Sequence, residues 1–492
     1  MDRREFLQGA GWMGLAAVAA GCLGRRGRFF DGASMQGFRC APLPNIRVGL
    51  VGCGQRGMTV LGRLPQIPGV EIVAFCDLHA ERPKVFNRWM SEHGYPTAKE
   101  YAGAEAYKAL CESDLDVVYV TTGWDLHVPV GVYAMEHGKH ALIEVPSANT
   151  LDECWQLVET AERTRRHCMQ LENCCYGEAE LLCLNLCRLG VLGEIVHGEA
   201  AYVHDLRELC HRDPIIEKPS WEDTGYENYW RLRYNVFHKG NHYETHGLGP
   251  VAKCMNINRG DRFDCICSLE SNQNAYELYA GAHFSKEDWR ARQRIDMGDI
   301  NTSVIRTVRG RTILLQHDVS SPRPYTRHNL ISGTRGVFQG IDFAEKPEDA
   351  LTNGNICRFA WEDRNGAGVH EYFGFDKTNE MRAKYAHPLW KKAGQVAAKV
   401  GGHGGMDFLM DLRWAYCLQN GLPLDTDVYD LAAWCAVGEL SERCVRGRRI
   451  EEFPDFTRGG WKTAAAFGVK DIDMRKMNFK DIRADDHALR IS

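Results

Sequence analysis

Two periods of apolar residues alternate along the first third of the chain. Short apolar, β-branched runs predict buried strands, and they cover residues 46–51, 70–76, 116–121 and 139–146. Helical patterns follow these runs, from residue 58 onward, over 129–137 and over 151–165. The last of these helices opens with a capping box made by Thr150 and Glu153. Strands that alternate with helices predict a doubly wound α/β Rossmann domain with a parallel sheet over residues 45–165.

The pattern changes in the second part of the chain, where paired apolar segments flank short turns. Two hairpins are predicted, one from 304–309 with 312–316 around Gly310 and one from 329–332 with 336–339. They predict an α+β domain over residues 166–492, built on an open, mainly antiparallel sheet, with C-terminal helices that pack back. Residues 345–400 show no regular period, and we expect them to form loops and insertions.

A glycine-rich turn joins the first predicted strand to the first predicted helix. Gly52-Cys53-Gly54-Gln55-Arg56-Gly57 offers one glycine for a tight turn, one for close approach to a pyrophosphate and one for packing of helix on strand. Asp77 ends the second strand, about 20 residues after Gly57, where a carboxylate can hydrogen-bond an adenosine ribose. A carboxylate there repels a 2′-phosphate, so the motif predicts NAD rather than NADP as the cofactor.

The N-terminus carries a candidate export signal over residues 1–30. Arg3-Arg4-Glu5-Phe6-Leu7 precedes a Gly/Ala-rich apolar stretch, residues 9–21, and then Cys22. This order is typical of a twin-arginine signal, and about 13 apolar residues are too few for a spanning helix, which needs roughly 20. The sequence therefore predicts export by the twin-arginine route to the periplasm or cell surface. Cleavage alone and a lipid anchor at Cys22 both stay open.

Composition narrows the class of protein. A chain of 492 residues exceeds the size at which one hydrophobic core keeps growing, so at least two domains are expected. A net charge of -5 gives no basic surplus, which argues against a nucleic-acid partner. The 19 cysteines are scattered without paired CxxC spacing, so we predict no metal site and expect most of them to be small buried apolar residues. Whether a homodimer forms stays open.

The glycine turn, Asp77, a Thr-rich strand end and residues 139–146 together resemble the Gfo/Idh/MocA family of sugar-type oxidoreductases. One position departs from that family. Its dehydrogenases carry Glu-Lys-Pro where this chain has Glu144-Val145-Pro146, and their lysine works near the hydroxyl that is oxidised. Because Val145 neither donates nor accepts a proton, a simple dehydrogenase of that pattern is disfavoured.

The second part of the chain narrows this resemblance. Three segments, residues 242–250, 256–262 and 401–408, are similar to glycoside hydrolase family 109, and the similarity spans residues 45–440. That family acts as an NAD-dependent α-N-acetylgalactosaminidase. The resemblance therefore implies NAD as the cofactor and a terminal N-acetylgalactosaminide of a glycan as the substrate.

The same resemblance implies the residues of the site. NAD would contact Gln55, Arg56, Asp77, Trp124, Asp125, Leu126, His127, Glu144, Val145, Asn173 and Tyr243. The sugar would contact Tyr202, Arg231, Tyr243, Glu244, Thr245, His246 and Tyr325. Arg233, two residues from Arg231, is an alternative to it. These residue types suit a sugar site, because aromatic faces cover apolar sugar edges and a guanidinium donates to sugar oxygens.

Tyr243 and His246 are the candidate catalytic pair. In an NAD-dependent glycosidase, oxidation at C3 of the sugar acidifies the C2 proton, the C1 substituent is eliminated, water adds, and the hydride returns to C3. This sequence needs proton carriers at the C3 hydroxyl and at C2, and Tyr and His are suitable. If the chain is helical there, the two rings project to one side. Which side chain takes the C2 proton stays open, and His403 ranks below this pair.

Three functions compete at this point. The first is removal of terminal α-linked N-acetylgalactosamine from glycans outside the cytoplasm. The second is net oxidation of a free sugar or cyclitol by NAD, which Val145 disfavours. The third is a sugar-binding surface lipoprotein whose nucleotide is only structural. A chromogenic α-N-acetylgalactosaminide separates the first two, because only an oxidoreductase accumulates NADH.

Overall fold

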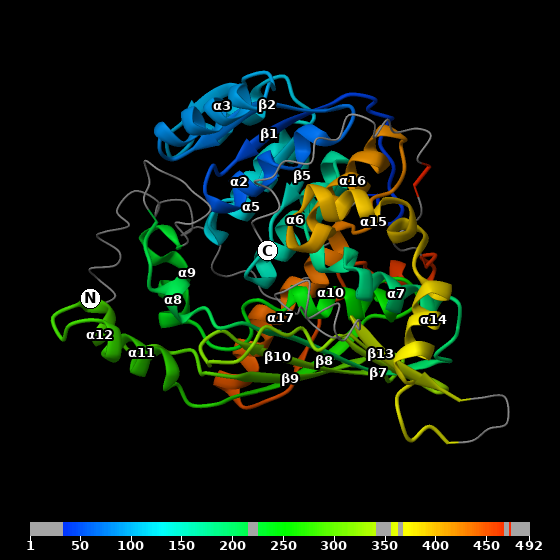
Figure 1. The fold of residues 1–492 in the computed structure, drawn as a ribbon. Coiled ribbons are helices and arrows are strands. Elements are labelled where there is room, and N and C mark those ends of the chain that lie inside the picture. Colours follow the sequence, from blue (N-terminus) through cyan, green and yellow to red (C-terminus); the bar gives the residue numbers. More distant parts are fainter. Residues whose placement is uncertain (1–32, 215–224, 341–355, 363–367, 467–471, 474–492) are drawn as a thin grey trace.

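The computed structural model describes residues 33–214, 225–340, 356–362, 368–466 and 472–473. A parallel sheet with its helices forms the upper part of the molecule in Figure 1, a second sheet forms the lower part, and helices lie between them. The candidate export signal, with Arg3, Arg4 and Cys22, lies outside the described residues. Within the described part of the chain, no helix is both long enough and apolar enough to cross a membrane.

The first sheet has six strands in the order β3-β2-β1-β4-β5-β6, and all neighbours are parallel. Its strands are β1 (Ile46–Val51), β2 (Val70–Asp77), β3 (Lys99–Ala102), β4 (Val117–Val120), β5 (His140–Ile143) and β6 (Cys168–Gln170). The predicted doubly wound parallel sheet is confirmed, and it runs to Gln170, past the predicted domain end at residue 165. The strand order reverses between β1 and β4, where such sheets bind ligands at the carboxyl ends of their strands.

Two helices of this domain begin earlier than predicted. The helices are α2 (Gln55–Leu61), the 3-10 turn η1 (Leu64–Gln66), α3 (Glu81–Glu92), α4 (Ala106–Glu112), α5 (Trp124–Glu136) and α6 (Leu151–Thr164). Starts at residues 58 and 129 were expected, but the chain becomes helical directly after Gly54 and after Gly123. The first turns of α2 and α5 are polar or aromatic, so apolar periodicity does not reveal them. The capping box that opens α6 is confirmed.

The second sheet has eight strands in the order β13-β12-β11-β7-β10-β9-β8-β14. They are β7 (Ile195–Val203), β8 (Phe263–Glu270), β9 (Asn301–Thr307), β10 (Thr312–Asp318), β11 (Leu330–Gly333), β12 (Gly336–Gly340), β13 (Cys357–Trp361) and β14 (Glu451–Glu452). Only β7 and β10 pair in parallel among these described strands. Both predicted hairpins, β9 with β10 and β11 with β12, are confirmed, as is the open, mainly antiparallel sheet.

Helices cover the face of the second sheet that is turned toward the first domain (Figure 1). This part of the chain contains η2 (Asn173–Tyr176), α7 (Glu178–Arg188), α8 (Arg207–Cys210), η3 (Glu227–Tyr229), α9 (Trp230–Phe237), α10 (Thr245–Cys254), α11 (Ala275–His283), α12 (Trp289–Arg292), α14 (Phe375–Tyr385), α15 (Pro388–Val400), η4 (His403–Gly405), α16 (Met406–Gln419), α17 (Val428–Gly447) and η5 (Gly460–Lys462). Of these, α10 lies against β7 and α17 against β8.

The expectation of loops over residues 345–400 is wrong for most of the described part. That part contains β13 and the helices α14 and α15. In α15 the residues Leu389, Ala393, Ala397 and Val400 are all buried, which is the spacing of one helix face. The sequence carries this spacing, and in the fold α15 packs on α16.

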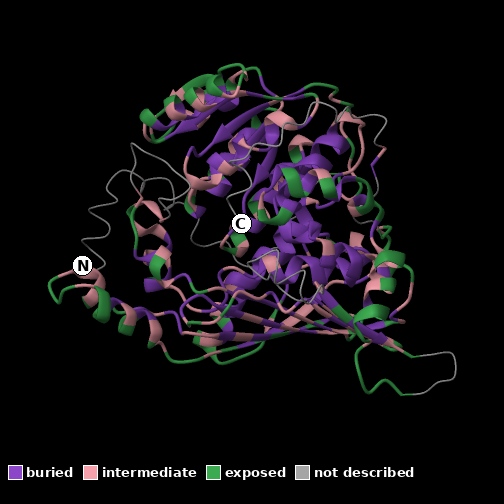
Figure 2. Ribbon diagram, viewed as in Figure 1, coloured by how far each residue is buried: buried purple, intermediate pink, exposed green. Residues whose placement is uncertain are grey.

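One helix of the C-terminal part lies deep between the two domains. Figure 2 shows α16 buried along nearly its whole length, and it lies against η2 and against β1. The polar residues Asp407, Asp411 and Arg413 of this helix are buried with it. Buried charges are stable only when they are paired, so α16 must find its ionic partners on neighbouring elements. One of these sets of partners belongs to the candidate site.

Candidate active site

The glycine turn after β1 opens onto a cleft of about 450 Å³. A Cβ at Gly52 would lie 2.6 Å from the backbone of Thr121, and one at Gly57 would lie 2.2 Å from the Gly52 oxygen. Gly54 instead faces open space. The turn therefore packs tightly on two sides and leaves room at Gly54 for a pyrophosphate, directly before the start of α2. Gln55 and Arg56, in the first turn of α2, line the same cleft.

Asp77 braces the glycine turn and borders the cleft. One of its carboxylate oxygens accepts a hydrogen bond from the Cys53 backbone at 2.7 Å, and the other accepts one from the His79 backbone at 2.9 Å. Arg82 lies 3.6 Å from Asp77 but pairs at 2.8 Å with Glu227, which comes from the second domain. The carboxylate of Asp77 thus remains an acceptor for a ribose hydroxyl, and its negative charge repels a 2′-phosphate.

A buried ion-pair network joins the first domain to α16. Arg56 lies 2.7 Å from Glu144 and 2.8 Å from Asp407, and Arg63 lies 3.3 Å from Asp407. Asn173 donates a hydrogen bond to the second oxygen of Asp407. Burial alone would raise the pKa of the Asp407 carboxyl, but the surrounding cations, Arg56 foremost, hold it well below its ordinary value. Three residues predicted to contact NAD, Arg56, Glu144 and Asn173, belong to this network. Asp407 was not predicted.

Asp407→Asn is expected to destabilise the protein by about 3–5 kcal/mol at neutral pH, because Arg56 and Arg63 each lose one of their two carboxylate partners. The pKa of the Asp407 carboxyl is lower in the folded than in the unfolded chain. Its stabilisation is therefore complete above about pH 4 and is lost as the pH falls below that value. Urea unfolding at neutral pH and at about pH 3 measures both effects, and the wild type should lose stability more steeply than the variant.

Glu136→Gln is the control for this prediction. Glu136 pairs with Arg163 on the surface, where the two side chains are 43% and 49% exposed. Such a pair contributes less than about 1 kcal/mol. If both variants lost the same free energy of unfolding, the buried ion pairs around Asp407 would contribute no more to stability than an exposed ion pair.

The first turn of α5 sends two side chains into the cleft and two away from it. Asp125 and Leu126 line the cleft. Trp124 packs edge-on against aromatic rings of α9. His127 is buried, and its two ring nitrogens lie 2.8 and 3.1 Å from backbone oxygens. A contact between His127 and NAD would therefore come from its backbone.

Arg231 on α9 is a buried cation surrounded by aromatic rings. Its guanidinium lies 4.6 Å from the centre of the Tyr243 ring and 5.9 Å from that of Tyr202. It donates to the Tyr226 hydroxyl at 2.8 Å, and its Nη2 has no hydrogen-bond partner among the described residues. A buried donor without a partner is costly, which suits a ligand oxygen at this position. Arg233 binds a backbone oxygen elsewhere, so of the two predicted alternatives only Arg231 lies in this cluster.

Tyr243 and His246 lie next to each other where α10 begins. Their ring centres are 4.9 Å apart and the rings stand at 86°. The His246 Nδ1 lies 2.8 Å from a carboxylate oxygen of Glu172, which is fully buried. Burial alone would raise the pKa of the Glu172 carboxyl, but His246 and a backbone hydrogen bond lower it below its ordinary value. A carboxylate at Nδ1 fixes the proton on that atom and leaves Nε2 as a hydrogen-bond acceptor.

Tyr243 complements this acceptor. Burial, and next the neighbouring Tyr202, raise the pKa of the Tyr243 hydroxyl well above its ordinary value. The phenol is therefore protonated at neutral pH and donates a hydrogen bond. Together the pair presents one donor and one acceptor, which a reaction with two proton carriers requires.

Glu172→Gln is expected to lower kcat by about 10²-fold through the orientation and charge of His246. Steady-state kinetics of the variant measures this loss. Glu172→Asp, which keeps the carboxylate, should restore part of the rate, and a Glu172→Gln variant with the wild-type kcat would mean that the carboxylate only supports the fold.

The other predicted sugar contacts divide into two groups. The rings of Tyr202, on β7, and Tyr325 meet edge to face with centres 6.0 Å apart, and Tyr325 accepts a hydrogen bond from Arg327 at 3.1 Å. Glu244 and Thr245 are 1% and 0% exposed, and burial raises the pKa of the Glu244 carboxyl well above its ordinary value. The two tyrosines therefore border the aromatic cluster, whereas Glu244 and Thr245 are buried in the core.

Comparison with known proteins covers both domains. The family model described as glycosyl hydrolase 109, C-terminal domain, matches residues 176–463, and that of the oxidoreductase family with an NAD-binding Rossmann fold matches residues 46–171. A glycosyl hydrolase family 109 protein of Shewanella pealeana is 45% identical over 442 residues, which cover 89% of this chain and 91% of that protein. The chain belongs to glycosyl hydrolase family 109. The alpha-N-acetylgalactosaminidase of Bacteroides fragilis is 42% identical over 433 residues, 88% of this chain and 96% of its own length.

Solved structures share the fold of this family 109 chain. A levoglucosan dehydrogenase in complex with NADH and L-sorbose has a TM-score of 0.59 and 16% identity, and the match covers 83% of this chain and 99% of that one. The predicted NAD cofactor is confirmed by the Rossmann family model together with the cleft at the glycine turn. The chain is thus a glycosyl hydrolase with the fold of an NAD-binding oxidoreductase.

The site of this family 109 chain differs in part from the site predicted from the sequence. Glu172 and Asp407 were not predicted, although each directly pairs with a predicted residue. The only signal in the sequence was position, since Glu172 precedes Asn173 and Asp407 ends a glycine-rich segment. Conversely, the family-like segment 256–262 lies outside the site, because its Arg259 pairs with Asp430 at the start of α17, at 2.6 Å.

Proposed function

We propose that this enzyme removes terminal α-linked N-acetylgalactosamine from glycans by NAD-dependent hydrolysis. The observation that carries the proposal is the place of Tyr243 and His246. They lie beside Trp124, whose ring centre is 6.1 Å from that of Tyr243 and which opens the helix turn that borders the nucleotide cleft. The name of the Bacteroides fragilis relative supports the same substrate.

NAD fits the residues that the first domain presents. The open space at Gly54 would take the pyrophosphate, and Asp77 would bind the adenosine ribose. When bound, NAD supplies a reversible acceptor for the hydrogen at C3 of the sugar. Asp125 and Leu126 form part of the wall that holds it. Val145 is buried and has no titratable group, so the side chains that transfer protons must belong to the second domain.

The second domain supplies the proton carriers. The Nε2 atom of His246, oriented by Glu172, removes the proton at C2 and later returns one. The proton of the C3 hydroxyl passes to water as C3 is oxidised, and the protonated Tyr243 hydroxyl then donates a hydrogen bond to the carbonyl oxygen at C3. The unpartnered Nη2 of Arg231 donates to a hydroxyl or acetamido oxygen and fixes the sugar against Tyr202 and Tyr243.

We further propose that the enzyme acts outside the cytoplasm. Arg3 and Arg4, followed by a short apolar stretch, favour export by the twin-arginine route, which carries folded proteins and so allows the cofactor to bind first. Cys22 is the candidate for a lipid anchor. Mass spectrometry of the mature N-terminus after expression with a functional twin-arginine system tests this, and an uncleaved, cytoplasmic chain would contradict it.

The activity is tested with a chromogenic aryl α-N-acetylgalactosaminide. We expect release of the aryl alcohol by the NAD-loaded enzyme while absorbance from NADH stays at the level of the enzyme itself. Formation of one NADH for each sugar consumed would instead identify a net sugar or cyclitol oxidoreductase. Full hydrolysis by a variant that lacks both Tyr243 and His246 would contradict the assignment of these two residues.

A further inference from the structure

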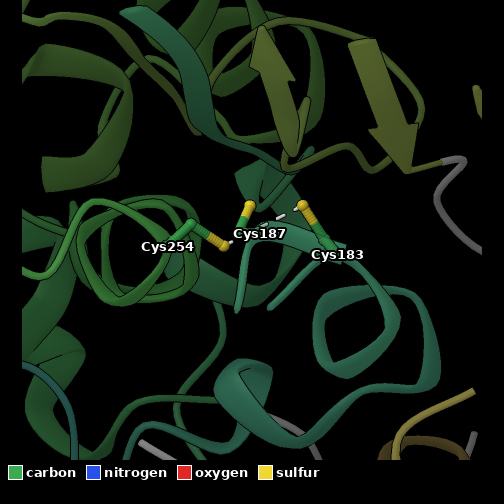
Figure 3. A group of neighbouring side chains, drawn as sticks. All are labelled: Cys183, Cys187 and Cys254. Carbon is green, nitrogen blue, oxygen red and sulfur yellow. Dashed lines mark hydrogen bonds between the residues drawn. The ribbon is translucent and has the colours of Figure 1, made fainter. Parts of the chain in front are cut away.

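Three cysteines from two helices meet below the candidate site. Cys183 and Cys187 lie one turn apart on α7, and Cys254 is the last residue of α10 (Figure 3). The sulfurs of Cys183 and Cys254 are 3.9 Å apart, although these residues are separated by 71 positions in the sequence. All three sulfurs lie within 4.8 Å of one another. The sequence alone shows only the Cys183 and Cys187 pair, which is why no metal site was predicted.

These distances match a metal site better than a disulfide. Zinc–sulfur bonds of about 2.3 Å at tetrahedral angles place two sulfurs about 3.8 Å apart. A disulfide needs a sulfur–sulfur distance of about 2.05 Å. Cys183 and Cys254 are buried while Cys187 is half-buried, so the group can be reached from one side, where water can serve as a fourth ligand.

The ends of two helices meet at this group of sulfurs. Cys187 lies in the last turn of α7, and Cys254 ends α10. Helix C-termini carry partial negative charge, so two of them converging on one point attract a cation.

We propose that Cys183, Cys187 and Cys254 form a structural site for a thiophilic divalent cation of the zinc class. The ion would fasten the end of α7 to the end of α10. The opposite ends of the same two helices lead into the site, since α10 begins beside His246 and α7 follows the segment that carries Glu172. The cation would therefore stabilise the helix pair that aligns Glu172 with His246 without taking part in the reaction.

Cobalt(II) titration of the full-length protein tests this proposal. After reduction and removal of metal, the wild type should bind one Co²⁺ with the absorption of thiolate-to-cobalt charge transfer, and one equivalent of Zn²⁺ should remove that absorption. Cys187→Ser should weaken binding by at least tenfold. Cys267→Ser, an exposed cysteine on β8, should leave it unchanged. A second group of possible ligands is formed by Glu172, Cys174 and His246, and Cys174→Ser, which removes one of them, should also leave binding unchanged.

X-ray absorption of the zinc-loaded wild type gives a test that needs no variant. We expect about three sulfur neighbours at about 2.3 Å. A spectrum without sulfur neighbours, or charge-transfer absorption that survives in Cys187→Ser, would overturn the proposal. So would a reduced protein that takes up no metal, in particular if the aerobic protein shows the mass of a Cys183–Cys254 disulfide. None of these three results would contradict the proposed hydrolysis.

Discussion

His246→Ala should lower kcat for the aryl α-N-acetylgalactosaminide by about 10²–10⁴-fold, the range for loss of a positioned general base. The reason is geometric, because Glu172 holds Nδ1 at 2.8 Å and so presents Nε2 to the sugar. Binding of NAD should be unchanged, since His246 does not line the nucleotide cleft. Steady-state kinetics with a parallel measurement of NAD affinity checks both statements.

The control for this variant is His283→Ala. His283 is exposed at the end of α11, away from the site, and its replacement should leave kcat unchanged. If His246→Ala retained more than about a tenth of the wild-type rate, His246 would not be the base. A loss that came with reduced thermal stability would be assigned to folding, and His246→Gln, which keeps much of the volume, would then decide the question.

Removal of the dinucleotide should abolish hydrolysis altogether. Both proton carriers remain in the stripped enzyme, but the C2 proton of an unoxidised sugar is not acidic enough for them to remove. Substoichiometric NAD, less than one molecule per sugar turned over, should restore the rate, because the cofactor is regenerated in each cycle. NADP should not restore it, because Asp77 repels the 2′-phosphate. Hydrolysis at full rate by protein free of dinucleotide would contradict the account.

The first domain could be predicted from the sequence in most respects because its determinants are local. The apolar run of β1, the glycines of the turn and Asp77 lie within one strand–turn–helix–strand unit. Helix starts were less accurate, since α2 and α5 begin with residues that carry no apolar period. The helix α15 was missed although its buried residues Leu389, Ala393, Ala397 and Val400 recur at the spacing of one helix face.

The candidate site could be predicted only in part. Tyr243 and His246 are close in sequence, so their proximity followed from the turn they share. Glu172 and Asp407 reach their partners from distant segments, and no pattern in the chain indicates which buried carboxylate meets which cation. The same holds for Cys254, whose neighbours Cys183 and Cys187 lie on another helix. Contacts between side chains that are far apart in the sequence therefore could not be predicted from it.

The origin of the hydrogen at C2 of the released sugar tests the central claim most directly. The wild-type enzyme would hydrolyse its glycoside in D₂O, and NMR of the free N-acetylgalactosamine would report on C2. Removal of the C2 proton and later return of one from His246, as proposed, predicts deuterium at C2 in the product. A product that keeps its original hydrogen at C2, formed at the normal rate, would contradict the account.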